Sequence, residues 1–277
     1  MSAPTATLRG PRVPAAPSAV PAIAAQTWWM THRRLKAFVR QPAYLVITLI
    51  QPVIWLFLFG SLFRKVVELP GFGAASYLDY LVPGVVVMSA VSANMWAGMG
   101  ALEEIERGTL NRFLITPVSR SAIMNANVVE QALSTTIQSL IIVLLGLAGG
   151  AHYPGGAVGL FVLVAASVLL GTVFSAMSNA IGMLVRQRET IIGVNTFLLL
   201  PLTFLSSVFM AKALMPHWMQ NVAAFNPVNW ALEAGRAALA DSPDWHAVWT
   251  RGGALLALAV LMVWLSTRTF RTYQKSV

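Results

Sequence analysis

The chain of 277 residues is 57% hydrophobic and only 10% charged, with a mean hydropathy of +0.68, and these values predict an integral membrane protein. It contains no cysteine, which excludes disulfides, thiol catalysis and cysteine metal sites. The formal net charge is +9. We assign these charges to the membrane edges, because lipid head groups and topology control explain them more simply than nucleic acid does.

The first 40 residues are predicted to lie outside the hydrocarbon core. Residues 1–26 are rich in Ala, Pro, Ser and Thr and lack apolar periodicity, so we expect a disordered cytoplasmic tail. Residues 27–40 place apolar side chains such as Trp28 and Phe38 on one helical face and cations such as Lys36 on the other. This pattern predicts an amphipathic helix at the membrane interface.

Six apolar blocks follow, and a helix needs roughly 20 residues to cross a bilayer. The clearest signal is the stretch from Gln131 to Val185, 55 residues without Asp, Glu, Lys or Arg, which a break at residues 149–156 divides into two. We therefore expect an all-α fold in which residues 27–277 form one transmembrane domain. The expected spans are Ala43–Leu62, Leu81–Leu102, Gln131–Ala148, Ala157–Val185, Thr190–Ala211 and Ala247–Thr267.

The positive charges predict the orientation of these spans. A cytoplasmic N-terminus places 14 of the 19 Lys and Arg residues inside and five outside. The positive-inside rule therefore predicts that both termini and residues 103–120 are cytoplasmic, and that residues 212–246 are outside.

Residues 103–120 are the most informative of the polar segments. Leu110, Phe113 and Leu114 form an apolar stripe at i, i+3 and i+4, and Arg107 and Arg112 flank it. A short helix of this kind suits a groove on a partner protein. A surface helix at the lipid interface is the alternative.

The same segment resembles the signature of ABC-2 type transporter permeases, in the branch that contains daunorubicin exporters. The matching residues are Glu106-Arg107-Gly108-Thr109-Leu110, Phe113-Leu114 and Thr116-Pro117-Val118-Ser119-Arg120. A second match lies between the fifth and sixth spans, where residues 215–220 and 225–230 resemble the outer loop of that family. The resemblance extends from about Thr27 to the end of the chain. Asn111-Arg112 departs from the commonest pattern, which has an acidic residue here.

The resemblance implies the fold of ABC-2, or type V, exporters and a role for each segment. Residues 103–120 would be a coupling helix that docks on a separate cytoplasmic P-loop ATPase, and residues 216–239 would form short re-entrant helices on the outer side. Two permease chains, identical or sister, would pair in a bacterial plasma membrane. The residues assigned to ATPase coupling are Glu106, Arg107, Gly108, Thr109, Leu110, Arg112, Phe113, Leu114, Pro117 and Arg120.

The sequence contains no G-x-x-x-x-G-K-[ST] motif, so the chain has no P-loop with which to hold ATP. We therefore expect a transport subunit that is not itself an enzyme and binds no cofactor. ATP and magnesium would bind to the partner ATPase. The four histidines lie outside the expected spans, which argues against a metal site in the membrane.

Polar residues suggest two further sites. Asn94 and Asn195 are candidates for the substrate path, because an amide in a span should face water or protein, and hydrogen bonds between helices are the alternative. Glu233 and Arg236, at i and i+3, can form a local salt bridge. Candidates for an outer gate, or alternatively for a cap on the dimer, are Pro216, Trp218, Asn226, Pro227 and Trp230.

These features together predict the permease subunit of an ATP-driven exporter of hydrophobic or amphiphilic compounds. Export of a cell-envelope lipid or glycan by the same mechanism is the alternative cargo. A proton-coupled secondary transporter would need several buried acids, which the spans lack. An intramembrane enzyme is disfavoured because the H-E-x-x-H and G-x-S-x-G motifs are absent.

Overall fold

The computed structural model describes residues 42–69, 76–106, 120–185 and 187–275, and every regular element in these ranges is helical, as predicted. The predicted tail at 1–26, the predicted interfacial helix at 27–40 and the central part of the predicted coupling segment lie outside the described residues.

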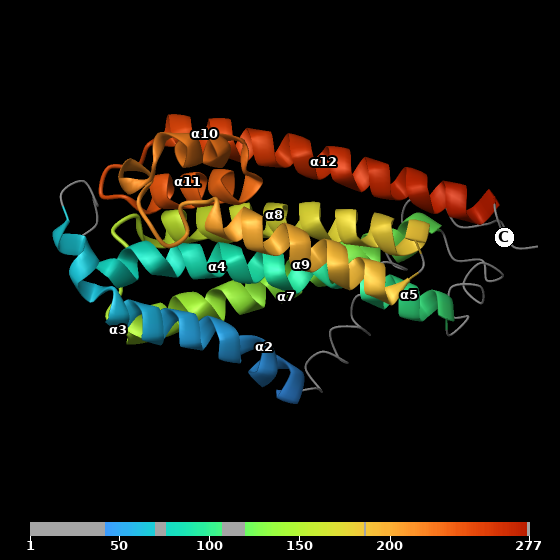
Figure 1. The fold of residues 1–277 in the computed structure, drawn as a ribbon, viewed down its shortest axis with the longest axis horizontal. Coiled ribbons are helices and arrows are strands. Elements are labelled where there is room, and N and C mark those ends of the chain that lie inside the picture. Colours follow the sequence, from blue (N-terminus) through green and yellow to red (C-terminus); the bar gives the residue numbers. More distant parts are fainter. Residues whose placement is uncertain (1–41, 70–75, 107–119, 186, 276–277) are drawn as a thin grey trace, which may run out of the picture.

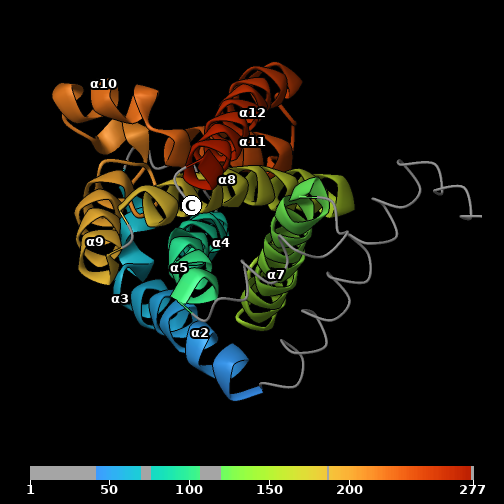
Figure 2. The ribbon, with the colours of Figure 1, turned by 90° about the vertical axis from the view of Figure 1, so that its right-hand side faces the viewer.

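Long helices run side by side along the molecule (Figure 1). α8 is central and packs against α4, α5, α7, α11 and α12 (Figure 2). The bounds of the long helices are α4 Tyr77–Met95, α5 Ala97–Glu106, α7 Arg120–Ala148, α8 Gly156–Val185, α9 Arg188–Phe204 and α12 Trp245–Lys275.

Four helical stretches in the described residues are long and apolar enough to cross a bilayer, namely Tyr77–Gly100, Val128–Ala148, Gly156–Val185 and Trp245–Thr269. The first and fifth predicted spans correspond to shorter helices. The first is an apolar stretch of Thr48–Leu62, and α9 has 17 residues. The chain is thus a multi-pass membrane protein, and the count of six spans stays a prediction.

The first predicted span is not a uniform α-helix. It consists of α2 (Pro42–Ile54), a π-helical turn η1 (Trp55–Phe59) and α3 (Gly60–Leu62), followed by a 3₁₀ turn η2 (Arg64–Glu68). An aromatic cluster joins this region to distant segments. The Trp55 ring lies 4.4 Å from that of Phe59 and 5.0 Å from that of Phe209, measured between centroids.

Short helices gather at one end of the molecule (Figure 1). They are η3 (Lys212–Leu214), α10 (His217–Phe225) and α11 (Pro227–Leu239). α11 lies very close to α8, because a Cβ on Gly159 would come within 2.6 Å of the Ala238 carbonyl oxygen. Two short helices therefore occupy the range predicted to be re-entrant, and their depth in the membrane stays a prediction.

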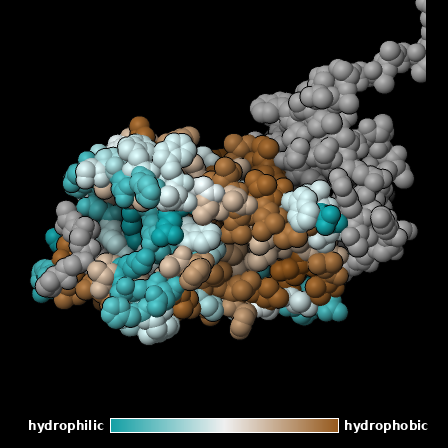
Figure 3. Space-filling model, turned by 90° about the horizontal axis from the view of Figure 1, so that it is seen from above, coloured by the Kyte–Doolittle hydropathy of each residue, from teal (hydrophilic) through white to brown (hydrophobic). Residues whose placement is uncertain are grey.

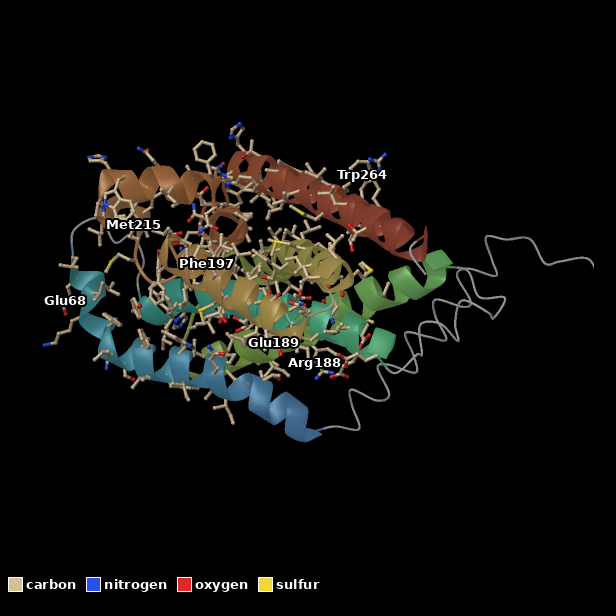
Figure 4. All side chains as sticks on the ribbon, turned by 45° about the vertical axis from the view of Figure 1, so that its right-hand side comes forward. Glu68, Arg188, Glu189, Phe197, Met215 and Trp264 are labelled. Atoms are coloured by element: carbon tan, nitrogen blue, oxygen red, sulfur yellow. The ribbon has the colours of Figure 1, made fainter. Side chains whose placement is uncertain are left out.

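The helix connections alternate between the two ends of the molecule. Glu68 and Met215 lie at the end that holds α10, whereas Arg188 and Glu189 lie toward the other (Figure 4). Hydrophilic residues cover the first of these ends, and apolar residues cover the middle (Figure 3). The connections predicted to lie outside the cell are thus at one end of the molecule, and those predicted to lie inside are at the other. The direction of insertion stays a prediction.

Three helix boundaries differ from those predicted. α7 begins at Arg120, before the predicted start of the third span at Gln131. The apolar pattern marks only the part of a helix inside the membrane, and a helix that continues into polar surroundings needs no apolar side chains. The second predicted span is divided, since α4 ends at Met95 and α5 begins at Ala97. α9 ends at Phe204, seven residues before the predicted end at Ala211, because side chains from α11 bond to the backbone that follows, as described below.

Candidate functional site

At the end of the molecule predicted to be cytoplasmic, an ion pair joins two helices. Glu106, the last residue of α5, pairs with Arg188, the first residue of α9, through both carboxylate oxygens, and Arg188 Nε lies 3.3 Å from Glu106 Oε1. The bond and the charge of Glu106 raise the pKa of Arg188. A residue predicted to contact the ATPase is thus also linked to α9.

Most of the other residues predicted for coupling lie outside the described residues, and their contact with an ATPase stays a prediction. These residues are Arg107, Gly108, Thr109, Leu110, Arg112, Phe113, Leu114 and Pro117. Arg120 begins α7. The predicted segment 103–120 thus begins in the last turn of α5 and ends at the first residue of α7.

The break between α4 and α5 is held by polar side chains from other helices. The carbonyl of Met95, which ends α4, accepts a hydrogen bond from Ser178 Oγ on α8 and another from Asn195 Nδ2 on α9, the latter at 2.6 Å. Ser178 Oγ also accepts a bond from the Gly98 amide at 3.0 Å. These side chains satisfy backbone groups that a continuous helix would have paired internally.

The two predicted path residues lie close to this break. Asn94 donates to Ala90 O and to Thr135 Oγ1 on α7, both at 2.8 Å, and is 1% exposed. Asn195 is 2% exposed. Both amides therefore join helices within one chain, which agrees with the alternative weighed above. Their Oδ1 atoms are buried and accept no hydrogen bond from the described residues, and a role in the path stays a prediction.

Asn226 explains where α9 ends. Its Oδ1 accepts a bond from the Val228 amide and so caps the start of α11. Its Nδ2 donates to the carbonyls of Leu202 and Leu205, at 2.7 and 3.1 Å, at the end of α9. One side chain therefore ends one helix and begins another. Since the segment after α9 finds bonding partners outside the helix, helical geometry can stop there.

The remaining residues predicted for an outer gate divide into structural and exposed ones. Pro227 is the first residue of α11, and Trp230 Nε1 donates to the Ala224 carbonyl at 2.7 Å. Trp218 is 59% exposed, and Pro216 is also exposed. The structure thus brings Asn226, Pro227 and Trp230 together at the joint between α10 and α11, and a gating role stays a prediction.

Arg236 holds the irregular segment that follows α9. Its guanidinium donates to the carbonyls of Ser207 at 2.7 Å, Val208 at 3.3 Å and Tyr80 at 3.0 Å, and it lies 3.6 Å from the centroid of the Tyr80 ring. The Tyr80 hydroxyl also donates to Ser207 O at 2.6 Å. Burial lowers the pKa of Arg236, and Tyr80 acts in the opposite direction.

The local salt bridge that the spacing of Glu233 and Arg236 allows does not form. Glu233 instead pairs with Lys212 at 3.2 Å and with Arg251 of α12 at 2.6 Å, and it accepts a bond from Asn229 Nδ2 at 2.9 Å. The spacing allowed the local pair, but Arg236 is occupied by carbonyl groups from two other segments. Glu233 therefore joins three elements, namely η3, α11 and α12.

An open cavity of about 560 Å³ lies beside these ion pairs. Side chains and backbone from α4, the segment at 207–212, α11 and the first turns of α12 form its walls. Sequence reasoning did not find this site. The only signal in the sequence was the clustering of charges in residues 212–251, whose partners depend on the tertiary fold.

Comparison with known proteins decides the family. The ABC-2 type transporter family model matches residues 25–240, which include both motifs, the divided second span and α11. The chain belongs to the ABC-2 type transporter family. This ABC-2 permease is a transport subunit, as predicted from its sequence.

The relatives of this ABC-2 permease include proteins named for drug resistance. It is 27% identical to a daunorubicin resistance ABC transporter permease protein of Streptomyces coeruleorubidus, over 94% of this chain and 89% of that protein. It is 21% identical to a probable doxorubicin resistance ABC transporter permease protein of Mycobacterium tuberculosis, over 91% and 92%. An inner membrane transport permease of Escherichia coli strain K12 is 26% identical, over 74% and 80%.

Proposed function

We propose that this ABC-2 permease forms, with a separate P-loop ATPase, an exporter of hydrophobic or amphiphilic drugs across a bacterial plasma membrane. The observation that carries the proposal is the match to drug-resistance permeases over more than nine tenths of the chain. The lack of a P-loop in the sequence supports a partner ATPase, because transport against a gradient needs an energy source.

In the proposed mechanism, ATP binding closes the partner dimer and moves the segment between α5 and α7. Two described features suit the transmission of this movement. The pair Glu106–Arg188 connects the end of α5 with the start of α9, and the break after Met95 lets α5 change its direction relative to α4. Residues on α5 and α9 would then move together while the outer half of α4 stays packed in the core.

The composition of the spans supports the proposed cargo. The described helices carry apolar and aromatic surfaces with few charges. A binding site lined by such surfaces suits amphiphilic molecules. The permease would act as a dimer, with the path at the interface of two chains. The candidate spans in α7 and α12 have the smallest shares of buried residues, 28% and 17% respectively. These two helices therefore leave the largest surfaces for lipid or a second chain.

The test is ATP-dependent uptake of daunorubicin into inverted membrane vesicles that contain the permease and its ATPase. Uptake is expected with the wild-type pair and should disappear when the P-loop lysine of the ATPase is replaced. In the permease, Phe113→Asp should abolish both ATPase pull-down and uptake, because burial of a Phe contributes about 2 kcal/mol and a buried carboxylate costs more. Arg112→Ala should have a milder effect, since a rim charge contributes less.

Unchanged uptake across a panel of hydrophobic drugs, together with an altered envelope lipid profile in cells that lack the permease, would contradict drug export and favour the alternative cargo. Full activity of Phe113→Asp would instead place the ATPase contact elsewhere on the chain.

A further inference from the structure

The cavity beside Glu233 has an excess of positive charge. Lys212, Arg236 and Arg251 line it together with one carboxylate, that of Glu233. Three cations and one anion leave a formal charge of +2 on these four residues. His246 also lines the cavity and would add to this charge if protonated.

Two of the cations retain donors that face the cavity. Arg251 uses Nε for Glu233, and its two terminal nitrogens bond to none of the described residues. Lys212 makes one hydrogen bond, to Glu233 Oε1. The side chains of Lys212 and Arg251 are 41% and 34% exposed. An incoming anion could therefore bond to both without breaking the pairs that hold Glu233, because each group has more donors than Glu233 uses.

The cavity opens where the apolar surface of α12 begins. His246, Thr250 and Arg251 lie in the first two turns of the candidate span Trp245–Thr269, and Arg251 lies about 9 Å along the helix axis from Trp245. Trp245 and Trp249 are 45% and 76% exposed. Tryptophan at a span end is typical of the level of the lipid head groups.

An apolar strip continues from the cavity along α12. Gly253, Ala257, Leu261 and Trp264 follow Thr250 on one helical face, because their spacing keeps them within about 60° of it. All four are exposed, Leu261 by 48% and Trp264 by 49%. The molecule thus offers a cationic cavity directly followed by a surface that suits a hydrocarbon chain.

We propose that this cavity is a binding site for the anionic head group of an amphiphile, with the phosphate or carboxylate between Lys212 and Arg251 and the apolar part along α12. The charge excess selects an anion, the free donors hold it, and the apolar strip distinguishes an amphiphile from a soluble ion. The site does not depend on the direction of transport or on the drug cargo proposed above.

The experiment is nondenaturing mass spectrometry of the full-length protein in detergent, titrated with phosphatidylglycerol, with phosphatidylcholine and with inorganic phosphate. Phosphatidylglycerol should bind roughly tenfold more tightly than phosphatidylcholine, the effect of one charge-assisted hydrogen bond. Inorganic phosphate should displace it only at much higher concentration. Thr250→Glu should weaken phosphatidylglycerol binding by about tenfold, because it adds a negative charge to the cavity. Thr250→Gln introduces a side chain of the same size as glutamate but without the charge, and it should leave binding unchanged.

A second pair of variants controls for net charge. Lys212→Gln removes a cation from the cavity and should weaken binding, whereas Lys65→Gln removes an exposed cation of η2 and should not. Thermal unfolding of each variant establishes that it is folded. Equal affinity for the two lipids, or equal binding by Thr250→Glu and Thr250→Gln, would overturn the proposal. Displacement by inorganic phosphate at the same concentration as lipid would assign the cavity to a soluble anion and overturn it as well.

Discussion

At the scale of single residues, Arg236 joins two segments that are distant from it in the sequence. A guanidinium presents five N–H donors in a planar fork, and here four of them face the carbonyls of Tyr80, Ser207 and Val208 and the Tyr80 hydroxyl. These carbonyls belong to an irregular segment and to the start of α4. The segment after α9 is not helical at Ser207 and Val208, so side chains from α11 and α4, Arg236 foremost among them, make the bonds that helical neighbours would otherwise make.

We predict that Arg236→Lys and Arg236→Gln both destabilise the protein, by about 2–4 kcal/mol, because either change leaves buried carbonyls without donors. Lysine keeps the charge but lacks the planar fork, so it should not rescue the protein. The measurement is thermal unfolding in detergent, with Arg64→Gln, an exposed cation at the same end, as the control. If Arg236→Lys unfolds at the same temperature as the wild type, charge alone holds the irregular segment that contains Ser207 and Val208.

At the scale of the elements, the break between α4 and α5 is the feature most directly linked to the proposed coupling. Its carbonyl and amide groups are satisfied by Ser178 and Asn195, which belong to α8 and α9. α5 also crosses α8 closely, since a Cβ on Gly182 would come 2.7 Å from the Gly98 carbonyl oxygen. The break is therefore built into the packing of three helices and is specific to this position.

Removal of the supporting side chains should affect coupling more than stability. Ser178→Ala should cost about 1 kcal/mol in unfolding free energy, the usual contribution of such bonds in membrane proteins. It should also lower the amount of drug transported per ATP hydrolysed, since Ser178 no longer fixes the position at which α5 joins α4. Thr172→Val is a matched control on the same helix, because Thr172 bonds only to Val168 within α8. Equal transport per ATP in both variants would contradict a role of the break in coupling.

At the scale of the whole molecule, the connections gather at two opposite ends, as a multi-pass topology requires. The end with α10 and α11 carries the ion pairs of Glu233, and the other carries the pair Glu106–Arg188. The positive-inside rule predicts that the second of these ends faces the cytoplasm.

Orientation is testable with single cysteines, since the natural chain contains none. In intact cells, an impermeant thiol reagent should label Ser242→Cys, in the exposed turn before α12, and should not label Ser119→Cys. Permeabilised cells should label both, which controls for accessibility. The reverse pattern in intact cells would invert the orientation and exclude the proposed contact of residues 103–120 with a cytoplasmic ATPase.

The sequence by itself determined the membrane class, the family and the approximate place of the apolar helices. These properties depend on sums along the chain: apolar length sets whether a helix can cross a bilayer, and the motif residues are close together in the sequence. Span 4 illustrates this, because the predicted range Ala157–Val185 differs from α8 by one residue. The block is bounded in the sequence itself, by the Pro- and Gly-containing break at residues 149–156 and by the first charged residue at Arg186.

Only the tertiary structure decided where polar groups find their partners. Arg236 and Tyr80 are 156 positions apart, and Asn195 and Met95 are 100 apart, so no local pattern predicts either bond. Bonds of this kind also accompany the end of α9 at Phe204, where Asn226 donates to Leu202 and Leu205, and the end of α4 at Met95. In an apolar environment an unpaired polar group is costly, so the helices end where distant side chains satisfy the backbone. The cationic cavity follows from the same rule, because it forms where Glu233 joins three segments that the sequence keeps apart.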